Sequence, residues 1–115
     1  MRRSLATLLL LCAPTAWAGD YATCILDKAP GVANEAAAAA VHQMCLEENP
    51  GGLQAVAQGS GRGLFGFKSG AECTAKKASD TRSARAGLLI SGACRRLYDS
   101  PTFSYEDAFG LPAKN

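Results

Sequence analysis

Apolar side chains recur every three or four residues in two stretches of the chain, which is the spacing of one face of an α-helix. The first stripe lies within residues 35–48 and consists of Ala37, Ala38, Val41, Met44 and Cys45. The second stripe lies within residues 80–98 and consists of Ala86, Leu89, Ile90, Ala93, Cys94 and Leu97. The pattern therefore predicts two long amphipathic helices whose apolar faces meet in a small core.

A short helix is predicted before the first long one. Asp20 can cap a helix that reaches Lys28, and the Pro30–Gly31 pair then breaks it. Asn34 caps the long helix of residues 35–48, in which five consecutive alanines favour helix strongly. The two helices together form a short–long helical hairpin.

The second half of the chain repeats this order. Ser69 can cap a short helix that carries Cys73. The following long helix has three candidate caps and two candidate ends, which are Asp80, Thr81 or Ser83 and Leu97 or Tyr98. We therefore predict an all-α fold of two helical hairpins joined by a Gly-rich connector.

Residues 1–18 have the order of a cleaved export signal. Two arginines precede the apolar segment Leu5 to Ala13, and Ala16-Trp17-Ala18 offers the small residues that a signal peptidase reads. The apolar segment is too short to span a membrane. We expect a periplasmic protein whose single domain, 19–115, is divided into a first hairpin (19–50), a connector (51–70), a second hairpin (71–99) and an aromatic tail (100–115).

Four cysteines remain once Cys12 is removed with the signal. Cys24 and Cys45 enclose twenty residues, and so do Cys73 and Cys94. In an antiparallel hairpin, the first cysteine of each pair lies on the short arm opposite the second. We therefore favour the disulfides Cys24–Cys45 and Cys73–Cys94 over the two other connectivities.

The equal spacing suggests an internal duplication. A shift of 49 residues places Cys24 on Cys73 and Cys45 on Cys94. The same shift places Val41 on Ile90. Two copies are too few for a solenoid, so the repeat predicts one domain with two similar halves.

Charge is unevenly distributed after residue 18. Residues 19–60 carry one Lys and five acids, a net charge of −4, whereas residues 61–97 carry eight Lys and Arg and two acids, a net charge of +6. The candidate binding face for an anionic envelope component or an acidic envelope protein consists of Arg82, Arg85, Arg95 and Arg96. The alternative is that the basic and acidic halves only complement each other. Export makes nucleic acid a poor candidate partner.

Aromatic residues punctuate the tail. They are Phe103, Tyr105 and Phe109, and they either cover the hairpins or contact a partner. The connector offers the same two alternatives for Leu64, Phe65 and Phe67. Gly61, Gly63 and Gly66 fit the spacing G-x-G-x-x-G, but no strand is predicted before them, so we interpret this stretch as a connector rather than a nucleotide site.

Catalytic and metal-binding chemistry is sparse. His42 is the one histidine, and the cysteines are too widely spaced for a zinc site or a C-x-x-C redox motif. We therefore predict no enzymatic activity and no cofactor. In a less favoured alternative, His42 is the base of a small hydrolase and Glu35 approaches it from two turns away.

Two segments, CILDKAPGVANEAAAAAVHQMC and GAECTAKKASDTRSARAGLLISGACRRLY, resemble small exported proteins of Gram-negative bacteria. The resemblance covers most of residues 19–115 and implies an envelope setting, without an activity, cofactor or catalytic residue. We therefore expect a non-catalytic periplasmic binding or interaction protein. The alternative is a periplasmic inhibitor or immunity-type protein that blocks a toxin or hydrolase.

Overall fold

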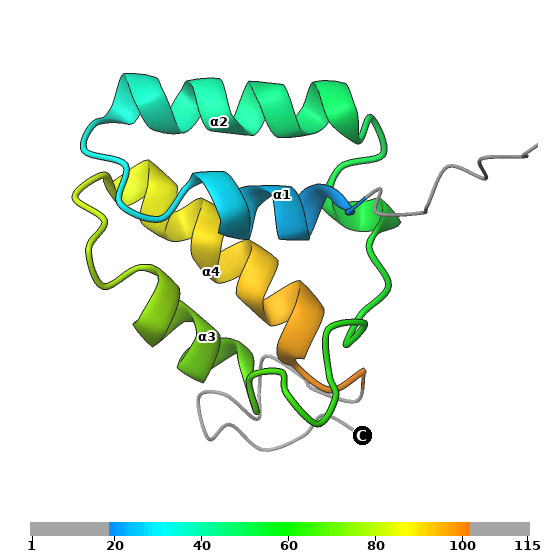
Figure 1. The fold of residues 1–115 in the computed structure, drawn as a ribbon. Helices are drawn as coiled ribbons and strands as arrows, with labels where there is room; N and C mark the ends of the chain where they lie inside the picture. The colour runs from blue at the N-terminus through cyan, green and yellow to red at the C-terminus, as the bar shows by residue number, and fades with distance from the viewer. Residues whose placement is uncertain (1–18, 102–115) are drawn as a thin grey trace, which may run out of the picture.

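The computed structural model describes residues 19–101, and this part of the chain is helical with no strand. Its elements are α1 (Tyr21–Lys28), α2 (Glu35–Glu48), the 3-10 helix η1 (Leu53–Ala55), α3 (Gly70–Lys77) and α4 (Ala84–Tyr98). In Figure 1, α2 lies above α1, α4 runs diagonally behind α1 from upper left to lower right, and α3 lies below and to the left of α4. The predicted all-α fold of two helical hairpins is confirmed. The predicted export signal lies outside the described residues.

Each α-helix begins at a capping side chain. The caps are Asp20, Asn34, Ser69 and Ser83, and each accepts a hydrogen bond from the N–H group three residues later at 2.8–3.1 Å. Such a bond satisfies an N–H group that has no partner within the helix. The helix bounds also follow the shift of the cysteines, since α1 and α3 begin at residues 21 and 70, and α2 and α4 at residues 35 and 84.

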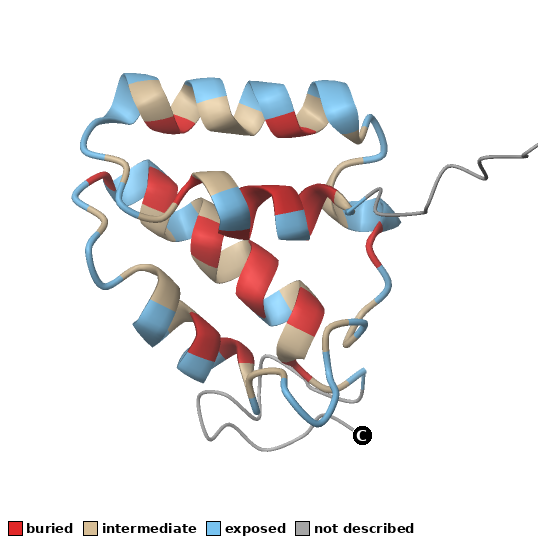
Figure 2. Ribbon diagram, viewed as in Figure 1, coloured by how far each residue is buried: buried red, intermediate tan, exposed pale blue. Residues whose placement is uncertain are grey.

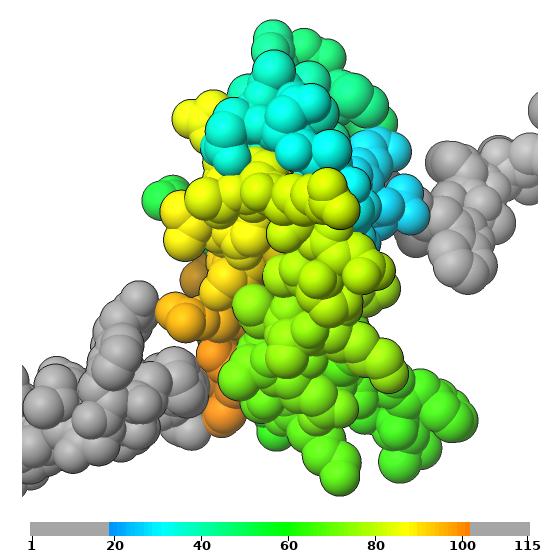
Figure 3. Space-filling view, turned by 90° about the vertical axis from the view of Figure 1, so that its left-hand side faces the viewer, coloured from blue at the N-terminus to red at the C-terminus, as the bar shows by residue number. Residues whose placement is uncertain are grey.

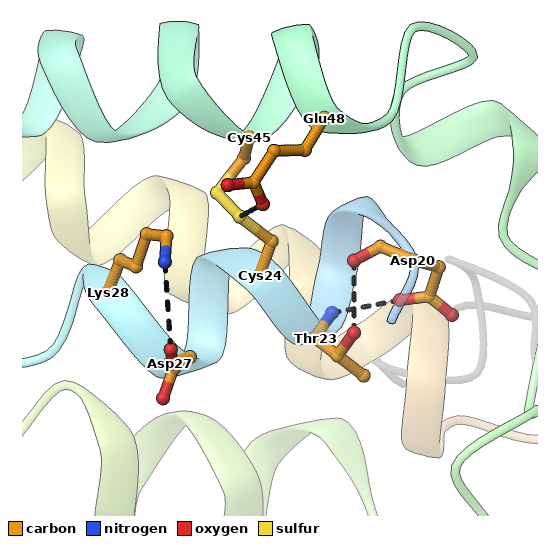
Figure 4. Close-up of polar contacts among 7 residues, drawn as sticks. All are labelled: Asp20, Thr23, Cys24, Asp27, Lys28, Cys45 and Glu48. Carbon is orange, nitrogen blue, oxygen red and sulfur yellow. Dashed lines mark hydrogen bonds and ion pairs between the residues drawn. A yellow bond between two sulfur atoms is a disulfide. The ribbon is translucent and has the colours of Figure 1, made fainter. Parts of the chain in front are cut away.

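Both predicted disulfides are present. The Cα atoms are 5.7 Å apart in Cys24–Cys45, which joins α1 to α2, and 5.5 Å apart in Cys73–Cys94, which joins α3 to α4. Figure 4 shows the first disulfide beside Glu48, whose Oε2 lies 3.5 Å from Cys24 Sγ. A disulfide sulfur has no proton to donate, so this is a contact and not a hydrogen bond. Each disulfide thus closes one hairpin.

Helix α4 is the centre of the core, because it contacts α1, α2 and α3. Five of the six residues of its predicted stripe are buried, namely Ala86, Ile90, Ala93, Cys94 and Leu97, and the sixth, Leu89, is partly buried. Ile25 of α1 and Val56 of the connector are among the largest fully buried side chains beside it. Figure 2 shows this buried surface running along α1 and α4, with α2 contributing a thinner strip.

The stripe predicted for α2 is too wide. Ala38 and Cys45 are buried, but Met44 is 46% exposed. Ala38 and Cys45 are seven residues apart and lie at nearly the same angle around the helix, whereas Met44 lies about 100° away from Cys45. Helix α2 covers the core from one side, so its narrow buried face leaves Met44 in solvent.

The two hairpins are tied together at their turns, which lie side by side in Figures 1 and 3. Gly31 N donates a hydrogen bond to Thr81 Oγ1 at 3.1 Å, and Arg82 N donates one to Val32 O at 3.3 Å. Gly31 has a φ of 81°, a conformation that favours glycine. The turn of each hairpin therefore fixes the position of the other.

Glu35, at the start of α2, holds the first turn of α4. Its Oε1 accepts a hydrogen bond from the Ser83 hydroxyl at 2.7 Å, and its Oε2 accepts one from Arg85 N at 3.3 Å. A carboxylate is stabilised at this end of a helix by the helix dipole. Glu35 thus ties the start of α4, in the second hairpin, to α2 of the first hairpin.

Candidate interaction surface

The connector folds over the carboxyl end of α4. Gly59 N donates a hydrogen bond to Arg96 O at 2.8 Å. Gly61 N donates one to Leu97 O, also at 2.8 Å. The last carbonyl groups of a helix have no partner within the helix, so the connector supplies the missing donors.

Two arginine side chains strengthen this attachment. Arg62 Nη1 donates a hydrogen bond to Tyr98 O at 2.7 Å. In the opposite direction, Arg96 Nε donates to Val56 O at 2.6 Å, and Arg96 Nη2 donates to Gln54 O at 3.1 Å. Arg96, which the sequence suggested as a partner-binding residue, holds the connector against α4.

The connector glycines allow a close approach to α4. A Cβ atom at Gly61 would lie 2.9 Å from Tyr98 Cε1 and 3.2 Å from Leu97 O, and one at Gly66 would lie 2.6 Å from Gly61 O. These separations are too short for ordinary van der Waals contacts, so only glycine fits at both positions. Gly61 and Gly66, the first and last glycines of the G-x-G-x-x-G spacing, therefore serve close packing, and the Gly61 N–H group is already bonded to Leu97 O.

Phe67 and its two apolar neighbours differ in environment. The Phe67 ring contacts the Tyr98 ring edge to face, with ring centres 5.2 Å apart. Leu64 and Phe65 are 97% and 102% exposed. Phe67 thus pins the connector to the core, while Leu64 and Phe65, together named the connector tip, extend into solvent.

A hollow of about 360 Å³ lies beside the connector tip. Its lining consists of Arg62, Gly63, Leu64, Gly66, Phe67 and Lys68. Two cations and no carboxylate line it, so it favours an anionic ligand. Arg62 and Lys68 are the candidate binding residues that the sequence analysis missed, although Arg–Gly–Leu–Phe–Gly–Phe–Lys places a cation on each side of the apolar residues.

A second hollow, of about 310 Å³, lies between the hairpins. Leu26 and Leu97 contribute apolar surface, and Asp27 and Lys77 contribute opposite charges. Asp27 also forms an ion pair with the Lys28 amino group at 3.8 Å, and Figure 4 draws the two side chains. This hollow has no charge preference that would identify a ligand.

The four arginines of the predicted basic face are divided between the two ends of α4. Arg82 and Arg85 are exposed and lie at its amino end, and Arg95 and Arg96 lie at its carboxyl end. The ten residues from Arg85 to Arg95 span about 15 Å of helix. The basic residues thus form two separate pairs, and the tail residues Phe103, Tyr105 and Phe109 lie outside the described residues.

His42 is half-buried and is hydrogen-bonded through Nδ1 to the Tyr21 hydroxyl, with the two atoms 2.5 Å apart. Burial raises the pKa of the Tyr21 hydroxyl above its ordinary value of 10.0. Glu35, the carboxylate suggested as a partner for His42, instead binds the first turn of α4. The geometry therefore assigns His42 a contact between α1 and α2.

Among residues 19–101, no group of three or more His, Cys, Asp and Glu residues is arranged to hold a metal ion. None of the helices in the same range is long and apolar enough to cross a membrane. At the connector tip, two highly exposed apolar side chains lie beside a hollow lined by two cations. Comparison with protein-family models, with curated proteins and with solved structures gives no match.

Proposed function

We propose that this protein is a non-catalytic interaction protein of the bacterial cell envelope and that the connector tip is its contact surface. The observation that carries the proposal is the full exposure of the adjacent side chains Leu64 and Phe65. Single exposed apolar residues are common, but adjacent apolar side chains that protrude together are typical of contact sites.

The attachment of the connector supports this role. Gly59, Gly61 and Arg62 all donate hydrogen bonds to α4, and Phe67 packs on Tyr98. The tip therefore extends from an ordered base, so binding requires little additional ordering of the chain. A preorganised loop binds more tightly than a flexible one for this reason.

The envelope setting rests on the disulfides and on the sequence of residues 1–18. Two disulfides in a small domain are typical of proteins in oxidising compartments. The amino-terminal order of arginines, apolar residues and Ala-x-Ala directs export. Both features favour the periplasm.

Affinity capture from a detergent-solubilised envelope fraction tests the proposed function. The bait is the processed protein with both disulfides, compared with the double variant Leu64→Ser/Phe65→Ser. Leu88→Ser is the matched control, because Leu88 is an exposed leucine (76%) on α4. We expect the wild type and the control to retain the same envelope components and the double variant to lose them. Equal retention by all three proteins would reject the tip as the contact surface.

An inhibitor or immunity-type protein is the second candidate function, and the same protruding tip supports it. A narrow, ordered loop suits insertion into the cleft of an enzyme. In the capture experiment, this role predicts one stoichiometric hydrolase or toxin whose activity falls when the protein is added. Retention of a hydrolase whose activity does not change would argue against inhibition.

A further inference from the structure

We propose that the connector tip binds the surface of an anionic lipid bilayer. Leu64 and Phe65 enter the boundary between headgroups and acyl chains, while a lipid phosphate occupies the hollow lined by Arg62 and Lys68. This inference rests on the proposed function and names the partner of the same surface.

The charges around the hollow favour a phosphate. Lys68 is exposed and lines the hollow together with Arg62. Arg62 uses Nη1 to bind Tyr98 O, but a guanidinium group has five N–H donors and can contact a phosphate as well. The nearby carboxylate of Glu72 accepts a hydrogen bond from Lys68 N at 3.3 Å and does not line the hollow.

The size of the apolar tip favours a bilayer over a protein. A standard protein interface buries about 800 Å² on each partner. Leu64 and Phe65 together supply roughly half of that, since an aromatic side chain buries about 150–250 Å². Insertion of a few apolar side chains, combined with attraction between cations and anionic lipids, is sufficient for binding at a membrane surface.

The wider charge distribution acts in the same direction. The connector tip belongs to the basic segment 61–97, which carries eight Lys and Arg against two acids. Long-range attraction therefore brings this part of the molecule toward a negative surface. The exposed apolar residues thus belong to the basic part of the sequence, and two of its cations, Arg62 and Lys68, lie beside them in the structure.

Co-sedimentation with lipid vesicles tests the inference on the processed, disulfide-bonded protein. We expect binding to vesicles of phosphatidylglycerol and phosphatidylethanolamine and much weaker binding to vesicles of phosphatidylcholine alone. Leu64→Ser/Phe65→Ser should weaken binding at least about tenfold, because both apolar side chains lose their burial in the bilayer. Its melting temperature should stay at the wild-type value, since both side chains are exposed in the free protein.

Two lysine variants distinguish phosphate binding in the hollow from a general attraction between a basic protein and an anionic membrane. Lys68→Gln should weaken vesicle binding about fivefold, the effect of one cation close to an anionic membrane. Lys76→Gln is the matched control, because Lys76 is an exposed lysine on α3 that does not line the hollow. Equal losses in the two variants would reject the hollow as the phosphate site.

Three further outcomes would overturn the membrane inference. Equal binding to anionic vesicles and to phosphatidylcholine vesicles would remove the role of charge. Displacement by millimolar inorganic phosphate, with no effect of the tip variant, would indicate a site for a soluble anion. Absence of vesicle binding, combined with tip-dependent capture of a protein, would indicate a protein partner and leave the proposed function intact.

Discussion

Gly61 and Gly63 lie two residues apart in the connector, and replacement of each by alanine should change stability in opposite directions. At Gly61, a Cβ atom would lie 2.9 Å from Tyr98 Cε1 and 3.0 Å from Leu97 Cβ. The Tyr98 ring can move, but Leu97 Cβ is fixed by the helix backbone, so the connector itself must shift. At Gly63, no atom lies within 4 Å of the added Cβ.

The magnitudes follow from two opposing contributions. Overpacking costs about 1–3 kcal/mol, and loss of the hydrogen bond from Gly61 N to Leu97 O adds about 1 kcal/mol. Replacing glycine by alanine lowers the entropy of the unfolded chain and stabilises the protein by about 0.4–1 kcal/mol. Gly61→Ala should therefore lower the free energy of unfolding by about 1–3 kcal/mol, and Gly63→Ala should raise it by about 0.4–1 kcal/mol.

Urea unfolding followed by circular dichroism, with both disulfides intact, measures these changes. In a thermal melt, each kcal/mol corresponds to a shift of about 4–8 °C for a domain of this size. The slope of the urea transition should stay the same, so that the midpoint reports stability. If both variants have the same stability, the connector does not pack closely on α4, and the tip does not extend from an ordered base.

Three further predictions concern the disulfides, the arginines and a buried tyrosine. Replacing Cys73 and Cys94 together by alanine should lower the free energy of unfolding by about 3 kcal/mol, because the disulfide closes a loop with a sequence separation of 21. Urea unfolding measures this change, and a loss below about 1 kcal/mol would show that closing the loop does not stabilise the fold to this extent. Arg96→Ala should lower the free energy of unfolding by about 1–3 kcal/mol, because it leaves two connector carbonyl groups without their donors. The exposed Arg82→Ala should change the same free energy by no more than about 0.5 kcal/mol. Equal losses in urea unfolding would show that Arg96 does not hold the connector. Burial raises the pKa of Tyr21, so the unfolded chain loses this phenolic proton first and stability falls as the pH rises above 10.0. The melting temperature of Tyr21→Phe should therefore fall less than that of the wild type over the same pH range. Identical pH profiles of the two proteins would show that Tyr21 does not contribute to the fall.

Local chemistry made much of the fold predictable. Asp20, Asn34 and Ser69 act as caps through hydrogen bonds to N–H groups only three residues away, so the local amino-acid sequence is sufficient to identify them. The disulfides were predictable because equal spacing and hairpin geometry favour the same pairing. For α4, the sequence left three candidate caps open, and the structure uses Ser83.

The contacts between distant segments were not predictable in this way. Arg96 was grouped with Arg82 by charge, yet its guanidinium binds carbonyls some forty positions earlier, a pairing that no local pattern encodes. Glu35 was considered only as a neighbour of His42, and it binds the first turn of α4 instead. Met44 was placed in the core because periodicity gives the direction of a stripe more accurately than its width.

In the candidate site, too, the local features were predictable and the contacts between distant residues were not. The sequence placed Leu64, Phe65 and Phe67 in the connector but left open whether they pin it or form a contact surface. The answer depends on where Tyr98 lies, because Phe67 packs on that ring and the other two residues do not. Only the folded chain shows that Arg62 and Lys68 line one hollow.

Site-specific photo-crosslinking in living cells shows directly whether the connector tip is the contact surface. A photoreactive phenylalanine analogue replaces Phe65 in one strain and the exposed Leu88 in another. We expect a discrete adduct, with a lipid or a protein, from position 65 and none from position 88. Equal adducts from both positions, or an adduct from position 88 alone, would show that the connector tip is not the contact surface.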